Sequence, residues 1–162
     1  MPETVISDTT PLQYLHQLGC LELLPTFYGS LMVPEGVVAE LAVGRAQGVF
    51  LPDLHTLSWL HIQPAPHLPI LPLAADLGRG ERETLALAVE HPGALALLDD
   101  GLARQFARHL GVAFTGTLGI LLKAKQQGHV AAVQPRLDQL QRLGFWLDAS
   151  TRASVLRLAG ES

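Results

Sequence analysis

Acidic side chains follow short apolar segments at several places in this sequence. Asp8 comes directly after TVIS, and Asp99 and Asp100 come directly after ALALL. Glu40 lies in a predicted helix, and Glu81 begins a helical pattern after a glycine-rich bend. Carboxylates gathered in one pocket repel one another, and their usual compensation is a hard divalent cation such as Mg²⁺ or Mn²⁺. The pattern therefore indicates a cation site suited to phosphodiester cleavage.

Short apolar strands alternate with helices along the chain, and this alternation positions the acidic residues. The sequence predicts strands at residues 4–7, 30–34, 58–63, 94–98 and 112–114. It predicts helices at residues 11–18, 20–29, 34–41, 81–90, 102–110, 117–127, 130–143 and 150–159. This order is typical of a three-layer α/β/α sandwich with a mostly parallel central sheet. In such a sheet, ligands bind at the carboxyl ends of the strands, where the strand order reverses.

Each acidic residue also has a purely structural interpretation. Asp8 precedes Thr-Thr-Pro and is typical of a turn or a helix cap. Glu40 fits a solvated helix face, and Glu81 fits a favourable charge at a helix N-terminus. One member of the Asp99–Asp100 pair suffices as a cap for the next helix. The joint placement of these residues, more than any one of them, favours the functional interpretation.

The composition is that of a folded chain with an uneven charge. The 162 residues are 48% hydrophobic, which excludes intrinsic disorder and fits one domain over residues 1–162. The formal net charge of −4 argues against a general polyanion binder. Residues 1–44 hold no Lys or Arg, whereas residues 101–162 hold eight of the 11. The C-terminal part is therefore expected to form a basic face.

Cysteine and histidine usage excludes several other kinds of site. A single cysteine, Cys20, excludes an internal disulfide framework and a cysteine-based zinc cluster. The seven histidines show neither H-x3-H nor HExxH spacing, so a zinc site is not expected. No secretion signal and no long apolar run is found, so we expect a cytoplasmic protein with no membrane partner.

Four segments resemble, in order and spacing, the motifs of PIN domains, most closely the VapC-like toxin nucleases of bacteria and archaea. VISDTTPLQYL is similar to the first motif and VPEGVVAEL to the second, which match Asp8 and Glu40. LGRGERETLALA resembles the third motif, with Glu81 as the match and Glu83 as its alternative. LALLDDGLARQFARHLGVAFTGTLGILLKAKQQG resembles the fourth acidic position and the closing part of the domain, and leaves Asp99 and Asp100 as alternatives.

The resemblance covers about residues 4–130, and the helices expected at 130–160 lie outside the common pattern. Glu81 and the LLDD pair differ from many toxin nucleases and are similar to a PIN-like subgroup described as predicted nucleic-acid-binding proteins.

The resemblance implies a PIN-like fold and a metal-dependent endoribonuclease, the toxin of a toxin–antitoxin pair. Mg²⁺ or Mn²⁺ would be held by Asp8, Glu40, Glu81 and Asp99 or Asp100. Phosphate-facing bases would be Arg104, Lys123 and Lys125. The implied partners are an RNA substrate, a small antitoxin protein and a second copy of the chain. The leucines of HLPILPLAADLG add apolar surface for that homodimer.

Two other functional classes fit part of the pattern. A non-catalytic PIN-like module would bind RNA or a protein partner without turnover. A receiver-like or phosphatase-like domain also places acids after parallel strands. Receivers need an acidic pair after the first strand, whereas the pair here comes late. Haloacid-dehalogenase phosphatases need an Asp where this chain has Thr10, so the sequence disfavours both.

Overall fold

Five parallel strands form a central sheet in the computed structural model, which describes residues 2–67 and 76–161. The order across the sheet is β3-β2-β1-β4-β5. The strands are β1 (Val5–Ser7), β2 (Leu31–Pro34), β3 (Leu60–Gln63), β4 (Leu95–Leu97) and β5 (Ala113–Thr115). Each lies where the sequence predicts it. The leucines at 68, 71 and 73, on which part of the dimer expectation rests, lie outside the described residues.

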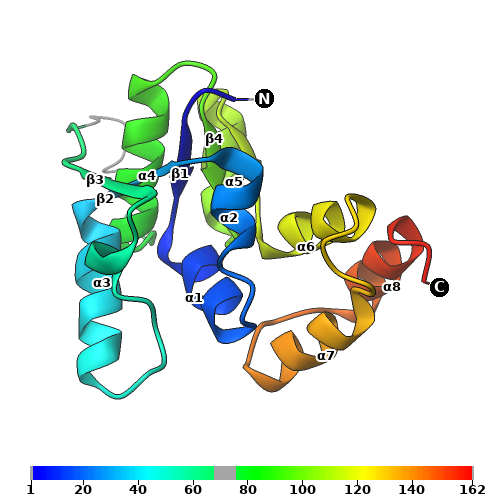
Figure 1. The fold of residues 1–162 in the computed structure, drawn as a ribbon. Helices are drawn as coiled ribbons and strands as arrows, with labels where there is room; N and C mark the ends of the chain where they lie inside the picture. Colours follow the sequence, from blue (N-terminus) through cyan, green and yellow to red (C-terminus); the bar gives the residue numbers. More distant parts are fainter. Residues whose placement is uncertain (1, 68–75, 162) are drawn as a thin grey trace.

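Helices cover both faces of the sheet (Figure 1). They are α1 (Thr9–Gln17), α2 (Leu23–Tyr28), α3 (Glu35–Ala46), α4 (Arg79–Glu90), α5 (Gly101–Leu110), α6 (Thr117–Gln126), α7 (Gln134–Arg142) and α8 (Ala149–Leu158), with a short 3-10 turn at Leu54–Thr56. No helix in residues 2–67 and 76–161 is long and apolar enough to cross a bilayer.

Side chains that alternate along the strands pack into two separate hydrophobic cores, one on each face of the sheet. Ile6 of β1 packs in one core with Leu85 of α4 and Ala103 of α5. Its neighbour Val5 packs in the other core with residues of α1, α2, α6 and α7, including Leu12. Successive strand residues point to opposite faces, so both faces of the sheet are buried. The predicted three-layer α/β/α sandwich is confirmed.

The strand order reverses between β1 and β4. Strands β1, β2 and β3 follow one another toward one edge of the sheet, and β4 then lies on the other side of β1. Ser7 is paired with Leu97, and the next residue, Asp8, donates its backbone N–H to the Leu97 carbonyl at 3.1 Å. The chain after β4 therefore leaves the sheet beside Asp8, at the position where open α/β sheets bind ligands.

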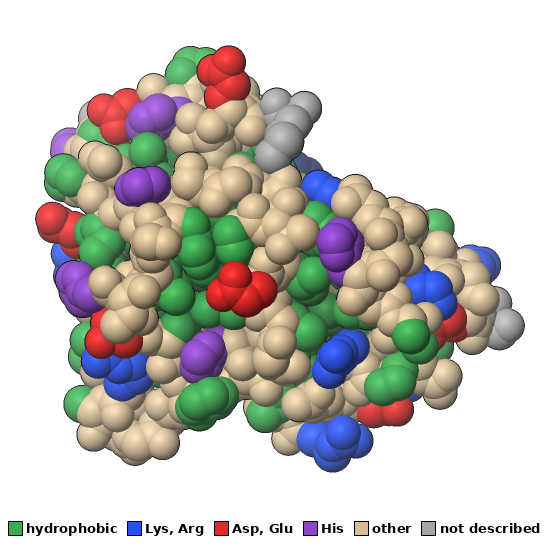
Figure 2. All heavy atoms as spheres, in the orientation of Figure 1, with side chains coloured by type: hydrophobic (Ala, Val, Ile, Leu, Met, Phe, Trp, Pro, Cys, Tyr) green, Lys and Arg blue, Asp and Glu red, His purple; other side chains and the backbone are tan. Residues whose placement is uncertain are grey.

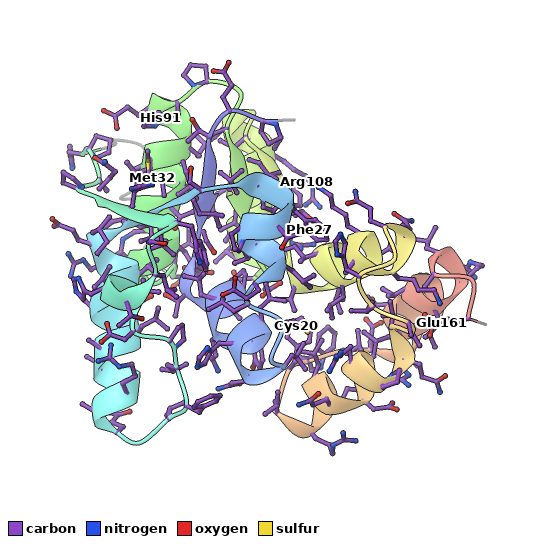
Figure 3. All side chains as sticks on the ribbon, in the orientation of Figure 1. Cys20, Phe27, Met32, His91, Arg108 and Glu161 are labelled. Carbon is purple, nitrogen blue, oxygen red and sulfur yellow. The ribbon has the colours of Figure 1, made fainter. Side chains whose placement is uncertain are left out.

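Three C-terminal helices extend from the sheet as an arm, which we define as residues 117–161 (Figure 1). Helix α7 begins at Gln134, four residues later than predicted. Glu161 accepts hydrogen bonds from the N–H groups of Val133 and Gln134, at 2.7 and 3.0 Å, and from Lys125 at 3.2 Å. Glu161, labelled in Figure 3, thus caps the start of α7 and joins it to α6.

The arm carries much of the basic charge on the face drawn in Figure 2. Lys and Arg side chains are frequent over the C-terminal helices, whereas Asp and Glu are more frequent over the rest of that face. The two signs are interspersed on the arm, because Asp138 pairs with Arg152 at 2.6 Å. This distribution follows the charge asymmetry of the sequence.

Candidate active site

Asp8 is a buried carboxylate at the carboxyl end of the central strand. It is 2% exposed, and its Oδ1 has no hydrogen-bond partner among the described residues. Although Asp8 occupies the N-cap position of α1, its side chain makes no capping hydrogen bond. Burial raises its pKa to about 8, and the charges of Glu81, Glu40 and Asp99 add to the rise. A structural cap does not account for this side chain.

Glu40, on α3, accepts hydrogen bonds from the first turns of α1 and α4, next to Asp8. Its Oε1 accepts a hydrogen bond of 2.6 Å from the Thr9 hydroxyl, and its Oε2 accepts one of 3.2 Å from the Gly80 N–H. A Cβ atom at residue 80 would overlap the Glu40 carboxylate and come within 3.0 Å of Asp8 Oδ1. Glycine at this position therefore leaves room for both carboxylates, and Glu40 is not a freely solvated helix residue.

Glu81 and Asp100 each cap a helix at the rim of the same edge. Glu81 Oε1 accepts from the Gly78 N–H at 3.0 Å, and Asp100 Oδ2 accepts from the Ala103 N–H at 2.9 Å. Burial is the main cause of the raised pKa of Glu81, and the charges of Asp100 and Glu40 raise it further. Capping thus accounts for one oxygen of each carboxylate, and the effect of Asp100 on the pKa of Glu81 indicates that the two side chains lie close together.

Asp99 is held by both of its oxygens. Oδ1 accepts from the Thr117 N–H and Oδ2 from the Thr117 hydroxyl, each at 2.7 Å. Burial raises the pKa of Asp99, while the Thr117 hydrogen bonds and the charge of Arg104 act in the opposite direction. The charge of Asp99 contributes to the raised pKa of Asp8, and that of Asp100 to the raised pKa of Glu81, so each pair lies close together.

Arg104 places a cation beside Asp99. Its Nε donates to the Leu98 carbonyl at 2.7 Å, and its guanidinium lies 5.2 Å from the centroid of the Phe114 ring. A Cβ atom at Gly116 would overlap both the guanidinium and the Asp99 carboxylate, so the two groups share one small space. A guanidinium fixed in this way can contact a phosphate next to the acidic group.

The structure does not bring the two predicted lysines to the acids. Lys123 lies 4.8 and 4.7 Å from the ring centroids of Phe27 and Tyr28, and Lys125 pairs with Glu161 at 3.2 Å (Figure 3). They lie roughly 9 and 12 Å along α6 from its first residue, at 1.5 Å per residue. Lys123 thus contacts α2 and Lys125 joins α6 to Glu161, and neither lines the hollow at Asp99.

The alternative match Glu83 has a structural contact instead. It accepts hydrogen bonds from the Gly36 N–H at 2.8 Å and from Arg79 at 2.6 Å, and so fixes α4 against the start of α3. Glu81, two residues earlier in α4, is the residue that joins the acidic group.

The carboxylates fit a hard cation by their chemistry. Within residues 2–67 and 76–161, no three carboxylate, imidazole or thiol groups already converge on one point. However, the unpaired Asp8 oxygen, the raised pKa values of Asp8, Glu81 and Asp99, and the all-oxygen donor set suit Mg²⁺ or Mn²⁺.

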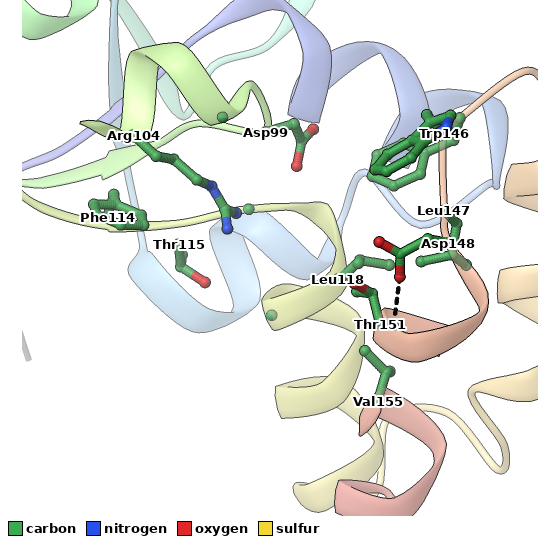
Figure 4. A pocket seen from close by; sticks show the side chains of 14 residues that line it. Asp99, Arg104, Phe114, Thr115, Leu118, Trp146, Leu147, Asp148, Thr151 and Val155 are labelled. Carbon is green, nitrogen blue, oxygen red and sulfur yellow. Dashed lines mark hydrogen bonds between the residues drawn. The ribbon is translucent and has the colours of Figure 1, made fainter. Parts of the chain in front are cut away.

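Two hollows of about 520 and 300 Å³ meet at Asp99. In the larger, Asp99 and Arg104 lie on one side and Trp146, Leu147 and Asp148 on the other (Figure 4). The smaller is lined by Thr10, Tyr14, Asp99, Asp100, Gly101, Phe145 and Trp146. The segment 145–148 of the arm therefore forms a wall opposite the acidic edge of the sheet.

Sequence reasoning missed Thr9, Thr117 and Trp146. Thr9 and Thr117 each follow a predicted strand, so the strand-end pattern that identified the acids also contains a signal for them. No such signal exists for Trp146, because it reaches the site only through the packing of the arm.

Comparison with protein-family models gives a match over nearly the whole chain. The model described as PIN domain, DUF3368, matches residues 4–161. The match extends past the segments that resemble the family motifs and includes α7 and α8. Comparison with curated protein sequences gives no match.

Proposed function

Because the chain belongs to the PIN domain family, which has a nuclease-type fold, we propose that it is a metal-dependent endoribonuclease. The observation that carries the proposal is Asp8, a buried carboxylate with one oxygen unpaired, at the point of the sheet where the other acids gather. A buried carboxylate is costly unless it is protonated or neutralised by a positive partner. A divalent cation is the partner that this family implies.

Asp8, Glu40, Glu81 and Asp99 would hold the cation, with Asp100 at the rim. Thr117 fixes the orientation of Asp99, and Thr9 and Gly80 fix that of Glu40. When bound, Mg²⁺ or Mn²⁺ would supply positive charge that stabilises the phosphate in the transition state and helps a water to lose its proton. No side-chain nucleophile is required, because the attacking group is water.

Arg104 would orient the substrate. Its guanidinium shares the space beside Gly116 with Asp99, so a phosphate that contacts Arg104 lies next to the acidic group. Positioning the phosphate is the contribution of Arg104.

In the cleavage step, water adds its oxygen to phosphorus, and the bond from phosphorus to the leaving oxygen breaks. The proton lost by water balances the one gained by the leaving oxygen.

The experiment is an RNA cleavage assay with Mg²⁺, with Mn²⁺ and with EDTA. We expect cleavage with either cation, none with EDTA, and a loss of at least about 100-fold in Asp8→Asn, a substitution of a group that acts on the transition state. Folding of the variant is checked by circular dichroism. Cation-dependent cleavage retained by a purified Asp8→Asn/Asp99→Asn double variant would overturn the assignment.

A second function, a non-catalytic module that binds RNA or protein, is favoured by one observation. No three ligand groups converge on one point in the described residues. The same assay separates the two functions, because such a module binds RNA but yields no product with either cation.

The resemblance to VapC-like nucleases supports a toxin role in the cytoplasm, with a small antitoxin and a second copy of the chain as partners. Val43 and Val49, at the end of α3 and in the loop after it, are 59% and 42% exposed and add apolar surface for a protein contact. Light scattering tests the homodimer: twice the mass of one chain supports it, and the mass of one chain contradicts it.

A further inference from the structure

Trp146 is a large apolar side chain left in solvent beside the active site. Its 81% exposure is the highest of the exposed large hydrophobic residues in the described part of the chain. It lines both hollows that meet at Asp99. Phe50, the other strongly exposed aromatic residue, stacks on His16 at 4.3 Å, whereas within residues 2–67 and 76–161 the indole of Trp146 has no aromatic or cationic partner.

The backbone on both sides of Trp146 is fixed. Phe145 packs edge-on against Tyr14 of α1, with ring centroids 5.0 Å apart and an angle of 82°. Asp148 accepts a hydrogen bond of 2.6 Å from the Thr151 N–H and so caps α8. Trp146 is therefore held at the wall of the hollow by its neighbours, and its exposure is not that of a mobile chain end.

The charges across the larger hollow distinguish its two sides. Arg104 lies on the side of the sheet, next to Asp99 (Figure 4). Asp148 lies on the side of Trp146, and hydrogen bonds from Thr151 lower its pKa, so it is ionised at neutral pH. Arg104, together with a cation held by the acids, would attract an anionic backbone, whereas Asp148 would repel it. A strand in this hollow is expected to place its phosphates toward Arg104 and its bases toward Trp146.

We propose that Trp146 stacks on an unpaired base of the RNA strand whose phosphate lies at Arg104 and Asp99, so that it is the residue of this chain that positions the base. The inference rests on the proposed nuclease function and adds a base-contacting residue to its site. In a duplex both faces of each base are covered by neighbouring base pairs, so an indole gains no stacking contact. Stacking on an aromatic side chain is available to every unpaired base and tolerates its sequence.

The two tryptophans of the chain allow a direct test by fluorescence. Trp59 packs against the core, so the Trp59→Phe variant leaves Trp146 as the only indole. A single-stranded RNA oligonucleotide, titrated in EDTA to prevent cleavage, should quench this emission to saturation. The Trp146→Phe variant, in which Trp59 alone emits, should show no quenching. Saturable quenching in both variants or in neither would contradict a stacking contact at Trp146.

Affinity is measured in parallel by anisotropy of a labelled single strand and a labelled duplex. We expect Trp146→Ala to weaken single-strand binding roughly tenfold or more and to remove the preference over duplex. Trp146→Phe should keep most of the affinity, and Phe50→Ala serves as the control for loss of an exposed aromatic ring.

The outcomes separate this inference from the function on which it rests. Cation-dependent cleavage by the native protein, together with equal single-strand affinity of the native protein and Trp146→Ala, would overturn the stacking role alone. Absence of both binding and cleavage in the native protein would overturn the nuclease and the stacking role together.

Discussion

Thr117 holds both oxygens of Asp99, with its backbone N–H on one and its hydroxyl on the other, each at 2.7 Å. Thr117 is the first residue of α6, so the arm begins at the residue that holds a candidate cation ligand. The orientation of Asp99 therefore depends on the position of the start of α6. Hydrogen bonds of this kind orient a ligating carboxylate and tune its basicity.

Replacing Thr117 by valine should impair the site without unfolding the protein. Val keeps the shape and the N–H but removes the hydroxyl donor to a charged group, which costs roughly 1.5–3 kcal/mol in the free energy of unfolding. We expect cleavage to fall about 10- to 100-fold. Thr26→Val is the matched control, because the Thr26 hydroxyl donates to the Glu22 carbonyl in an exposed helix. Equal activity of the two variants would contradict the role given to Thr117.

Alanine at position 80 should displace the acids that flank Gly80. The added methyl group would overlap the Glu40 carboxylate and approach Asp8 Oδ1 to 3.0 Å. Helix propensity alone would favour alanine by up to about 1 kcal/mol, so the clash opposes an intrinsic gain. We expect a smaller rise in melting temperature with Mn²⁺ than in the native protein.

The control for that variant is Gly101→Ala, at the start of α5, where a Cβ atom meets nothing within 4 Å. Gly101→Ala should leave the Mn²⁺-dependent rise in melting temperature unchanged. If Gly80→Ala also leaves it unchanged, the acids do not share the space beside residue 80.

The stability of the cation-free protein should fall as the pH rises from about 4 to about 8. Asp8 has a folded pKa of about 8 against 3.8 for an ordinary Asp, and those of Glu81 and Asp99 are also raised. Between these values the folded state keeps a proton that the unfolded state has lost. Acidification therefore favours folding, and the contribution is complete below the ordinary pKa.

Urea unfolding in EDTA at several pH values measures this effect. Between pH 5 and 8, the free energy of unfolding should change less steeply with pH in Asp8→Asn than in the native chain. Asp148 and Glu161 have lowered pKa values, so their effect has the opposite sign and falls at more acidic pH. A native slope that Asp8→Asn does not change would refute the buried, protonated Asp8.

Arg104 and Arg108 form a matched pair for testing phosphate contact. Both guanidinium groups lie over the Phe114 ring, at 5.2 and 5.1 Å, but only Arg104 lines the hollow at Asp99. Arg104→Gln should weaken single-strand RNA binding and reduce the slope of log affinity against log salt by about 0.7. Arg108→Gln should change that slope much less. Equal changes in the two variants would mean that the phosphate does not contact Arg104 specifically.

The sheet and its reversal point could be predicted because β1, β2 and β4 are short, mostly apolar runs that are soon followed by an acidic residue. Asp8 and Asp99 follow two such runs, and the alternation of strands and helices is enough to place both at one edge. The start of α7 was predicted too early, because the contact of Glu161 with Val133 and Gln134 joins segments distant in sequence.

Side-chain partners could not be predicted in the same way. Asp99 and Asp100 are equivalent in sequence, and only the packing of α5 and α6 shows that Asp100 caps α5 while Thr117 holds Asp99. The lysines of α6 looked available for phosphate, but α2 and the chain end occupy them. Trp146 approaches Asp99 only because α7 and α8 fold back toward the sheet.

Binding of Mn²⁺ measured by calorimetry at pH 7.5 tests the central claim, that the acids at the ends of β1 and β4 form a divalent-cation site. The account predicts saturable binding to the native protein, with stabilisation of about 2.7 kcal/mol at 100 times the Kd. It predicts loss of both effects in a folded Asp8→Asn variant. Saturable binding that Asp8→Asn leaves unchanged, or no binding to the native protein, would contradict it.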